Sequence, residues 1–458
     1  MYAQETYSLI ALFGAIVLCS LAIRLPIIRM SFIPASLAAG VLLLLLGTQV
    51  AGIYAPEWQL LESYYSFWRI FPALLINVVF ACIFLARPVL PFRKMWRLAG
   101  PQIAFGQTLA WGQYMIGGLL TILVLIPLFG ASPFSAALIE ISFEGGHGTV
   151  AGLTPVFNQL NFSEGRELAM GLATVSLSSA LVSGLVLIHW GVRRHHIKHM
   201  DKQTATRRAY HRRILYELRK QDLRLRDHLT IKNVISHLLL VATAVGFGWL
   251  IHFGLVLAEE TIWAEKLGIT IFKYLPMFTL CMFGGIIAHN IWKRLKFPIS
   301  RPLVELISAF SLSFLITTAV ATMSLSFIKT HPEIFLLLAI TGILWILFGF
   351  LVFAPRMFRY NWFQNGIVNM GQSMGMTATG LLFLNIVDPK DQTSSVESFG
   401  YKQLLFEPLM GGGIVTALSM PLILVWGLLP FTIICGIICI AWLLSGLLFF
   451  KKKQIYVR

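Results

Sequence analysis

Long apolar stretches, separated by short polar or basic segments, dominate this chain of 458 residues. Most stretches run for about 18 to 25 residues, the length of α-helix that crosses a hydrocarbon core about 30 Å thick. The pattern predicts an all-α polytopic membrane protein with about 11 transmembrane helices. The predicted spans are 8–24, 32–50, 66–86, 100–128, 164–190, 233–256, 270–292, 300–328, 332–354, 402–427 and 430–450.

Glycine and polar residues interrupt two further apolar segments, 133–160 and 361–388. The first contains SFEGGHGTVAGLTP and the second NMGQSMGMTATGLL. Non-helical backbone at membrane depth is tolerated only where it is buried in protein or lines a wet cavity. We therefore predict that both segments are re-entrant hairpins, the first entering from outside and the second from inside.

The order of spans and hairpins repeats along the chain. Each half has four spans, one hairpin and one span, and because five crossings is an odd number, the second half is inverted relative to the first. Both hairpins contain T-x-x-G-L. The predicted domains are a first repeat at 1–192, a basic loop at 193–232, a second repeat at 233–427 and an extra C-terminal helix with a basic tail at 428–458.

Composition and charge agree with a membrane protein. Only 12% of the residues are charged and 57% are hydrophobic, whereas a soluble domain has about 25% charged residues, so a cytosolic enzyme is excluded. The net charge is +16, and the positive-inside rule places the basic loop 193–232 and the C-terminus in the cytoplasm and the N-terminus outside. We expect lipid contacts and no nucleic acid.

The first predicted hairpin contains two titratable residues close together. Glu144 and His147 stand beside Gly145, Gly146 and Gly148. An acid at the bilayer centre costs about 2.5–3.5 kcal/mol, so Glu144 calls for a cation, a proton or a histidine partner. The alternatives are a Glu144 in water at the outer mouth and a His147 that only shapes the turn.

Glu140, four residues before Glu144, would lie on the same helix face and could couple to it. The second hairpin offers neutral oxygens, from Asn369, Gln372, Ser373, Thr377 and Thr379. These side chains could instead form helix–helix hydrogen bonds.

Half-helices that end inside a membrane present N–H groups to an anion and carbonyl groups to Na⁺. Two such hairpins could bind an anionic solute and a cation together.

The five cysteines all lie in apolar runs and are predicted to be small buried hydrophobes rather than metal ligands or disulfides. The sequence contains no HExxH, G-x-S-x-G or phosphate-cradling loop, so we expect neither an enzyme nor a metal site.

Four stretches resemble motifs of the bacterial sodium/glutamate symporter family. They are GGHGT at Gly145–Thr149, ELAMGLATVSL at Glu167–Leu177, GMTATGL at Gly375–Leu381 and PLMG at Pro408–Gly411. The resemblance covers about residues 8–192 and 233–427. It implies an elevator-type homodimer in the bacterial inner membrane that couples uptake of glutamate or a related small dicarboxylate to Na⁺, with no other cofactor.

The resemblance and the hairpin pattern together give the candidate site. The expected substrate-binding residues are Gly145, Gly146, His147, Gly148, Thr149, Gly375, Met376, Thr377, Ala378 and Thr379, and the expected ion-binding residues are Glu144, Asn369, Gln372, Ser373 and Thr416. The chain departs from the family where it carries Glu144 in place of Ser and Ala378 in place of Pro. It also has Phe383 in place of Asn, and Thr416 and Ser419 in place of Asp and Asn.

These departures leave alternatives for the function. The same fold could carry another carboxylate or a neutral solute, and coupling could use H⁺ through Glu144. A membrane sensor that signals through the basic loop is a further alternative from a different class.

Overall fold

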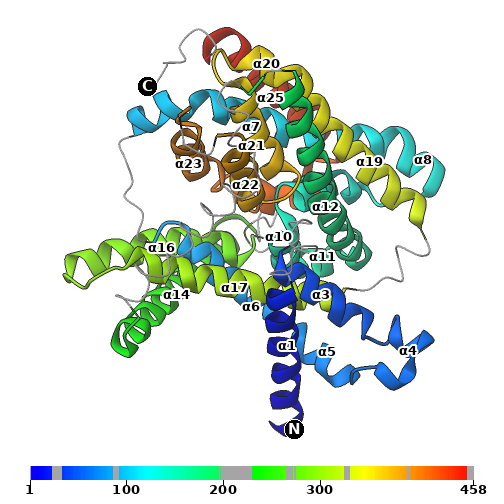
Figure 1. Cartoon of the computed structure of the whole chain (residues 1–458), viewed down its shortest axis with the longest axis vertical. Helices are drawn as coiled ribbons and strands as arrows, with labels where there is room; N and C mark the ends of the chain where they lie inside the picture. Colours follow the sequence, from blue (N-terminus) through cyan, green and yellow to red (C-terminus); the bar gives the residue numbers. More distant parts are fainter. Residues whose placement is uncertain are drawn as a thin grey trace. The chain divides into compact units, whose positions relative to one another are not determined.

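The structure is a computed structural model, and it describes residues 2–22, 34–85, 92–194, 196–197, 229–264, 272, 275–323, 331–388 and 392–450. All regular elements in these ranges are helices, which confirms the predicted all-α class (Figure 1). Eight helical segments are long and apolar enough to cross a membrane, and each overlaps a predicted span. They are Glu5–Ala22, Glu62–Cys82, Leu98–Phe129, Ser163–Arg193, Ile231–Ile262, Arg301–Ala321, Pro332–Met357 and Leu428–Phe450.

The other three predicted spans are not among these eight segments. The described part of 32–50 contains the short helix α3 (Ala35–Leu45), and the described part of 270–292 contains most of α16 (Met277–Arg294), which ends in two basic residues. The prediction of one continuous helix at 402–427 is wrong. It forms α23 (Ser395–Phe406) and α24 (Ile414–Trp426), because three consecutive glycines follow Pro408 and two of them take positive φ angles.

The described helices group into two units, each drawn from both sides of the loop 193–232. Unit 1 comprises residues 1–87, 147–171 and 230–332. Its helices are α1 (Tyr2–Ala22), α3, α4 (Ala51–Tyr54), η1 (Pro56–Trp58), α5 (Glu62–Trp68), α6 (Phe71–Cys82), most of α10 (Gly146–Gly152), α11 (Thr154–Gln159), the start of α12 (Ser163–Arg193), α14 (Ile231–Glu259), η4 (Glu260–Ala264), α16 and α17 (Arg301–Ala321).

Unit 2 comprises residues 88–146, 172–229 and 333–458. Its helices are α7 (Phe92–Leu120), η2 (Thr121–Leu125), α8 (Ile126–Phe129), η3 (Pro133–Ala137), α9 (Leu138–Phe143), the rest of α12, α19 (Pro332–Phe348), η6 (Gly349–Phe353), α20 (Ala354–Met357), α21 (Trp362–Ser373), α22 (Thr377–Val387), α23, α24, α25 (Leu428–Leu444) and η7 (Ser445–Phe450).

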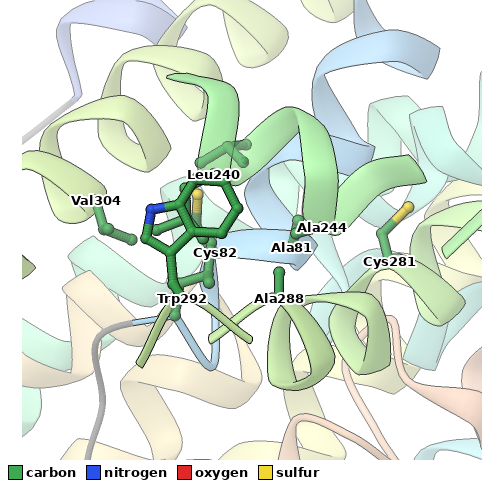
Figure 2. Close-up of a cluster of buried hydrophobic side chains, with 10 residues drawn as sticks. Ala81, Cys82, Leu240, Ala244, Cys281, Ala288, Trp292 and Val304 are labelled. Atoms are coloured by element: carbon green, nitrogen blue, oxygen red, sulfur yellow. The ribbon is translucent and has the colours of Figure 1, made fainter. Parts of the chain in front are cut away.

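Small residues hold the helices of unit 1 close together. A Cβ atom added to Gly284 on α16 would lie 2.1 Å from the carbonyl oxygen of Ala244 on α14, and one added to Gly285 would lie 2.3 Å from that of Ala81 on α6. Figure 2 shows Cys82 beside the Trp292 ring, with Ala81, Ala244 and Ala288 between that ring and Cys281 in the same buried cluster. Such close backbone approach is the usual basis of helix packing within a bilayer, where burial of apolar surface gives little driving force.

Unit 2 has an aromatic cluster at one end of α7. Phe105 and Phe450 pack with Met357 and Phe358 around the α7 backbone. On the same helix, Gly112 leaves room for the Trp345 ring, whose Nε1 donates to the carbonyl of Leu109 at 3.0 Å. These contacts fix α7 against α19 and α25, and α7 carries much of the polar interior described below.

Several sequence predictions fall outside the described residues. Most of the basic loop 193–232 and the basic tail 451–458 belong to this group. The domain boundaries and the inverted repeat stay predictions.

Candidate functional site

The second predicted hairpin is formed by α21 and α22, which pack against each other in unit 2. Glycines allow the contact: a Cβ on Gly371 would lie 2.9 Å from Cα of Gly380, and one on Gly380 would lie 2.2 Å from the carbonyl oxygen of Val368. The arms have 12 and 11 residues. A helix of that length rises about 18 Å, less than a hydrocarbon core of about 30 Å, so neither arm is long enough to cross.

The glycine-rich turn after α9, in the first interrupted segment, meets the turn between α21 and α22. Helix α9 ends at Phe143, and Gly146 takes a left-handed conformation with φ +69°. A Cβ atom on Gly146 would lie 3.8 Å from the carbonyl oxygen of Gly375, in the loop between α21 and α22. Both residues belong to unit 2, and the two interrupted segments therefore come together at their glycine-rich turns.

The break between helices α23 and α24 lies close to the turn that follows α9. A Cβ atom on Gly411 would lie 3.3 Å from the carbonyl oxygen of Glu144. The Gly411 N–H donates to Oε1 of Glu140 at 3.1 Å, and the Thr416 hydroxyl donates to the same oxygen at 2.8 Å. The Tyr114 hydroxyl of α7 donates to Oε2 at 2.5 Å. Glu140 is fully buried, and donors from three other segments satisfy its carboxylate.

Glu144 has a different environment, although it lies one helical turn from Glu140. Its side chain is 6% exposed. Within the described part of the chain, neither of its carboxylate oxygens has a hydrogen-bond partner. Lys402 and Glu140 act on it electrostatically, but in the described part of the chain neither a hydrogen bond nor an ion pair joins it to Lys402.

Lys402 of α23 is fully buried in unit 2, and sequence reasoning missed it. Its Nζ donates to Oε1 of Gln372 and lies 3.5 Å from the ring centroid of Phe406. The predicted span began at residue 402, where a lysine is ordinarily a snorkelling side chain at the membrane surface. Because α23 begins at Ser395, Lys402 is instead in the middle of a helix.

Buried amides line the rest of the polar interior. Asn369 Nδ2 donates to Oε1 of Gln102 at 2.9 Å, and Gln102 Nε2 donates to Oδ1 of Asn365 at 2.8 Å. Gln113 Nε2 reaches the carbonyl of Ser373 at 3.4 Å, where α21 ends. Helix α7 therefore contacts the hairpin at both ends of α21, and its glutamines are further site residues that the sequence analysis omitted.

Most of the predicted site residues lie together in unit 2. They are Glu144, Gly145, Gly146, Asn369, Gln372, Ser373, Gly375, Met376, Thr377, Thr379 and Thr416, with Ala378 in the first turn of α22. Thr377 accepts a hydrogen bond from Gln403 Nε2 at 2.7 Å. Helix α22 begins after Met376 with no side-chain cap.

The other three predicted residues, His147, Gly148 and Thr149, belong to unit 1 and are buried there. A Cβ atom on Gly148 would lie 3.1 Å from the Ile76 side chain.

All five cysteines are buried and free, as predicted. Among the described residues, no three His, Cys, Asp or Glu side chains are grouped so as to hold a metal ion.

A comparison with protein-family models identifies the family that the chain resembles. The family model described as sodium/glutamate symporter matches residues 3–389. The match includes both hairpins and ends before Pro408–Gly411, so the resemblance of that motif stays a prediction. No curated protein matches the chain.

Proposed function

Because this chain belongs to the sodium/glutamate symporter family, a family of multi-pass membrane transporters, we propose that it couples uptake of glutamate or a related small dicarboxylate to Na⁺ entry. The observation that carries the proposal is the meeting of the two hairpin turns, at Gly146 and Gly375, in one unit. Paired interrupted segments of this kind mark the substrate sites of secondary transporters.

The anionic group of the solute would bind at the start of α22. Its first residues present backbone N–H groups that no side chain caps, and the positive end of a helix dipole favours a carboxylate. The substrate residues of this unit are Gly145, Gly146, Gly375, Met376, Thr377, Ala378 and Thr379. Glycine at 145, 146 and 375 lets a ligand approach the backbone closely. We also assign His147, Gly148 and Thr149 to the substrate pathway on the basis of the motif GGHGT.

The cation would bind among the buried oxygens of unit 2. Glu144, Asn369, Gln372, Ser373 and Thr416 are the proposed ligands, and Glu140 adds a second buried carboxylate beside Thr416. Hard oxygen ligands suit Na⁺, and a buried negative charge is retained in a membrane protein only when a cation or proton compensates it.

An elevator mechanism is supported by the composition of the two units. Each unit takes helices from both halves of the chain, and the hairpin turns and buried charges lie in unit 2. Unit 2 would move the solute, and unit 1 would form the scaffold of a homodimer in the bacterial inner membrane. Cross-linking of the protein in native membranes tests the dimer, and the basic residues at the end of α16 should be labelled from the cytoplasm.

Uptake into proteoliposomes tests the proposed function. Protein reconstituted in liposomes should accumulate labelled glutamate under an inward Na⁺ gradient and not under an equal gradient of choline. Unlabelled dicarboxylates and neutral amino acids, added in excess, would identify the preferred solute. Uptake that follows a proton gradient and ignores Na⁺ would assign coupling to H⁺, for which the unbonded Glu144 carboxylate is the favoured group.

A further inference from the structure

Polar side chains from two segments of unit 2 meet where α22 begins. The hydroxyl of Thr377, the first residue of that helix, lies 3.5 Å from Oε1 of Glu407. Gln403 of α23 joins the two, because its Nε2 donates to the Thr377 hydroxyl at 2.7 Å and to Oε1 of Glu407 at 3.0 Å. A carboxylate therefore lies beside the uncapped start of α22, the place proposed above for the anionic group of the solute.

This cluster has more hydrogen-bond acceptors than donors. The Nε2 group of Gln403 already donates twice, whereas its Oε1 is buried and has no hydrogen-bond partner in the part of the chain that the structure describes. The side chain of Gln403 is only 3% exposed. An ionised carboxylate such as that of Glu407 accepts hydrogen bonds and donates none. Because a buried acceptor without a donor is unfavourable, the cluster suits a ligand that brings donors.

A solute can reach this cluster, in contrast to the buried charges of the same unit. Glu407, Thr377 and Met376 are half-buried, and so are Gly145 and Gly146 in the turn that meets Gly375. The carboxylates of Glu140 and Glu144 and the ammonium group of Lys402 are all buried. Among the acidic side chains close to the two turns, Glu407 is thus the one that is open to a ligand.

An α-amino acid carries its ammonium group on the carbon next to its carboxylate. A carboxylate bound to the first N–H groups of α22 would place that ammonium group close to Thr377, and therefore close to Glu407. An ammonium group has donors and no acceptor, which matches the excess of acceptors in the cluster. Its positive charge also matches the Glu407 carboxylate, and hydrogen bonds between charged groups are the stronger kind.

We propose that Glu407, together with the amide oxygen of Gln403, binds the α-ammonium group of the solute and so selects an amino acid over a plain dicarboxylate. A solute without the ammonium group would leave the Glu407 carboxylate unpaired beside its own negative charge, and such repulsion is a common source of specificity. The inference rests on the proposed function and narrows its solute class to acidic amino acids such as glutamate.

Competition for the uptake of labelled glutamate tests the assignment in the wild-type protein. Glutarate is the matched competitor, because it has the same carbon chain and both carboxylates but no ammonium group. A hydrogen bond between charged groups corresponds to about a tenfold to hundredfold difference in affinity, and glutarate should inhibit less well than unlabelled glutamate by that factor. Equal inhibition by the two solutes would overturn the assignment and leave Na⁺-driven transport of a dicarboxylate intact.

Glu407→Gln removes the charge and keeps an oxygen that accepts from Gln403. It should raise KM for glutamate by about tenfold or more, and the inhibition constant of glutarate should not rise. Glu397→Gln is the matched control, because Glu397 is an exposed glutamate of α23 that accepts from the Tyr401 hydroxyl at 3.1 Å. It should change neither value.

Two other results for Glu407→Gln would overturn the proposal. Tighter binding of both solutes would mean that the Glu407 carboxylate itself occupies the anion site and competes with the solute. An equal loss for both solutes would make Glu407 a structural residue of the turn.

Ligand binding to the purified full-length protein separates this inference from the proposed function. In detergent with NaCl, glutamate should raise Tm of the wild type more than glutarate at equal concentration, and Glu407→Gln should remove most of the difference. If Glu407→Gln yields no folded protein, the wild-type comparison decides. A wild type that prefers glutamate but shows no Na⁺-driven uptake would refute the proposed coupling and support the ammonium site. A wild type with Na⁺-driven uptake and equal Tm shifts for the two solutes would do the reverse.

Discussion

The helices of the two units pack through different kinds of residues. Unit 1 is held by glycine and alanine contacts, such as Gly284 against Ala244, and its buried threonines mostly donate to carbonyls of their own helix. Among the described residues, every buried Asn and Gln side chain lies in unit 2, and so do Glu140, Glu144 and Lys402. Unit 1 also buries Glu259, His147 and His237, so the units differ in their buried amides and in Lys402 rather than in the presence of buried ionisable groups. The buried amides and Lys402 direct the search for function to unit 2, because polar groups inside a membrane protein are costly and usually functional.

The largest effect should come from unit 2, at Lys402. Lys402→Met should lower the free energy of unfolding by about 3–5 kcal/mol, because it removes a hydrogen bond from a charged donor to Gln372 Oε1 and the contact of that ammonium group with the Phe406 ring. Combining it with Glu144→Gln should recover part of the loss if the two buried charges attract each other, as measured by unfolding in detergent. Equal stability of the single and double variants would mean that the two side chains are energetically independent.

The next largest effect is expected in unit 1, at Gly284. Gly284→Ala should cost about 2–3 kcal/mol, because the new Cβ would lie 2.1 Å from the Ala244 carbonyl oxygen and force α14 and α16 apart. Gly246→Ala, on α14, is the matched control: a Cβ there meets nothing within 4 Å, and alanine favours the helix by up to about 1 kcal/mol. If both variants behave alike in thermal unfolding, close backbone approach is not what holds unit 1.

Each unit has a buried tyrosine whose hydroxyl donates a hydrogen bond, and the strengths of these two bonds can be compared. Tyr114 donates to the Glu140 carboxylate in unit 2, and Tyr65 donates to the Leu43 carbonyl at 2.6 Å in unit 1. Because hydrogen bonds to charged acceptors are stronger, Tyr114→Phe should cost about 1.5–2 kcal/mol and Tyr65→Phe about 1 kcal/mol in unfolding experiments. Only Tyr114→Phe should also alter the Na⁺ dependence of uptake. A reversed order of stability would show that Glu140 is not charged.

Local sequence pattern was enough to locate the interrupted segments. Glycine and polar residues within apolar runs predicted two interrupted segments, of which 361–388 forms the packed pair α21 and α22, and an acid among glycines drew attention to Glu144. The first segment as a hairpin stays a prediction. Family resemblance, now confirmed by the matched model, added the type of transporter.

The local sequence pattern did not reveal which residues would contact the buried side chains of the site. Thr416 was expected to bind an ion, but its contact with Glu140 spans 276 residues of sequence and depends on tertiary packing. Lys402 was missed for a local reason, since a helix start placed seven residues too late turned a buried lysine into a surface one. The three glycines after Pro408 were a readable signal for the break that follows α23.

The smallest expected effect concerns a single interhelical hydrogen bond in unit 1. The Thr317 hydroxyl of α17 lies 3.0 Å from the Ser36 carbonyl of α3 and 2.9 Å from the Ser313 carbonyl of its own helix. Its neighbour Thr318 donates only within α17, to Phe314 and Leu315. Thr317→Val should therefore cost about 0.6 kcal/mol more than Thr318→Val, the mean value for such bonds in a membrane protein.

The pair of variants separates the bond between helices from the loss of a hydroxyl, since both replace a buried threonine by a residue of nearly equal shape. Unfolding in detergent measures the difference. Equal costs would mean that unit 1 depends on the fit of its small residues alone, as its glycine contacts already suggest. A difference above about 2 kcal/mol, larger than the range measured for such bonds, would mean that hydrogen bonding matters as much in unit 1 as in unit 2, and the contrast between the units would then rest on Lys402 and the buried amides of unit 2.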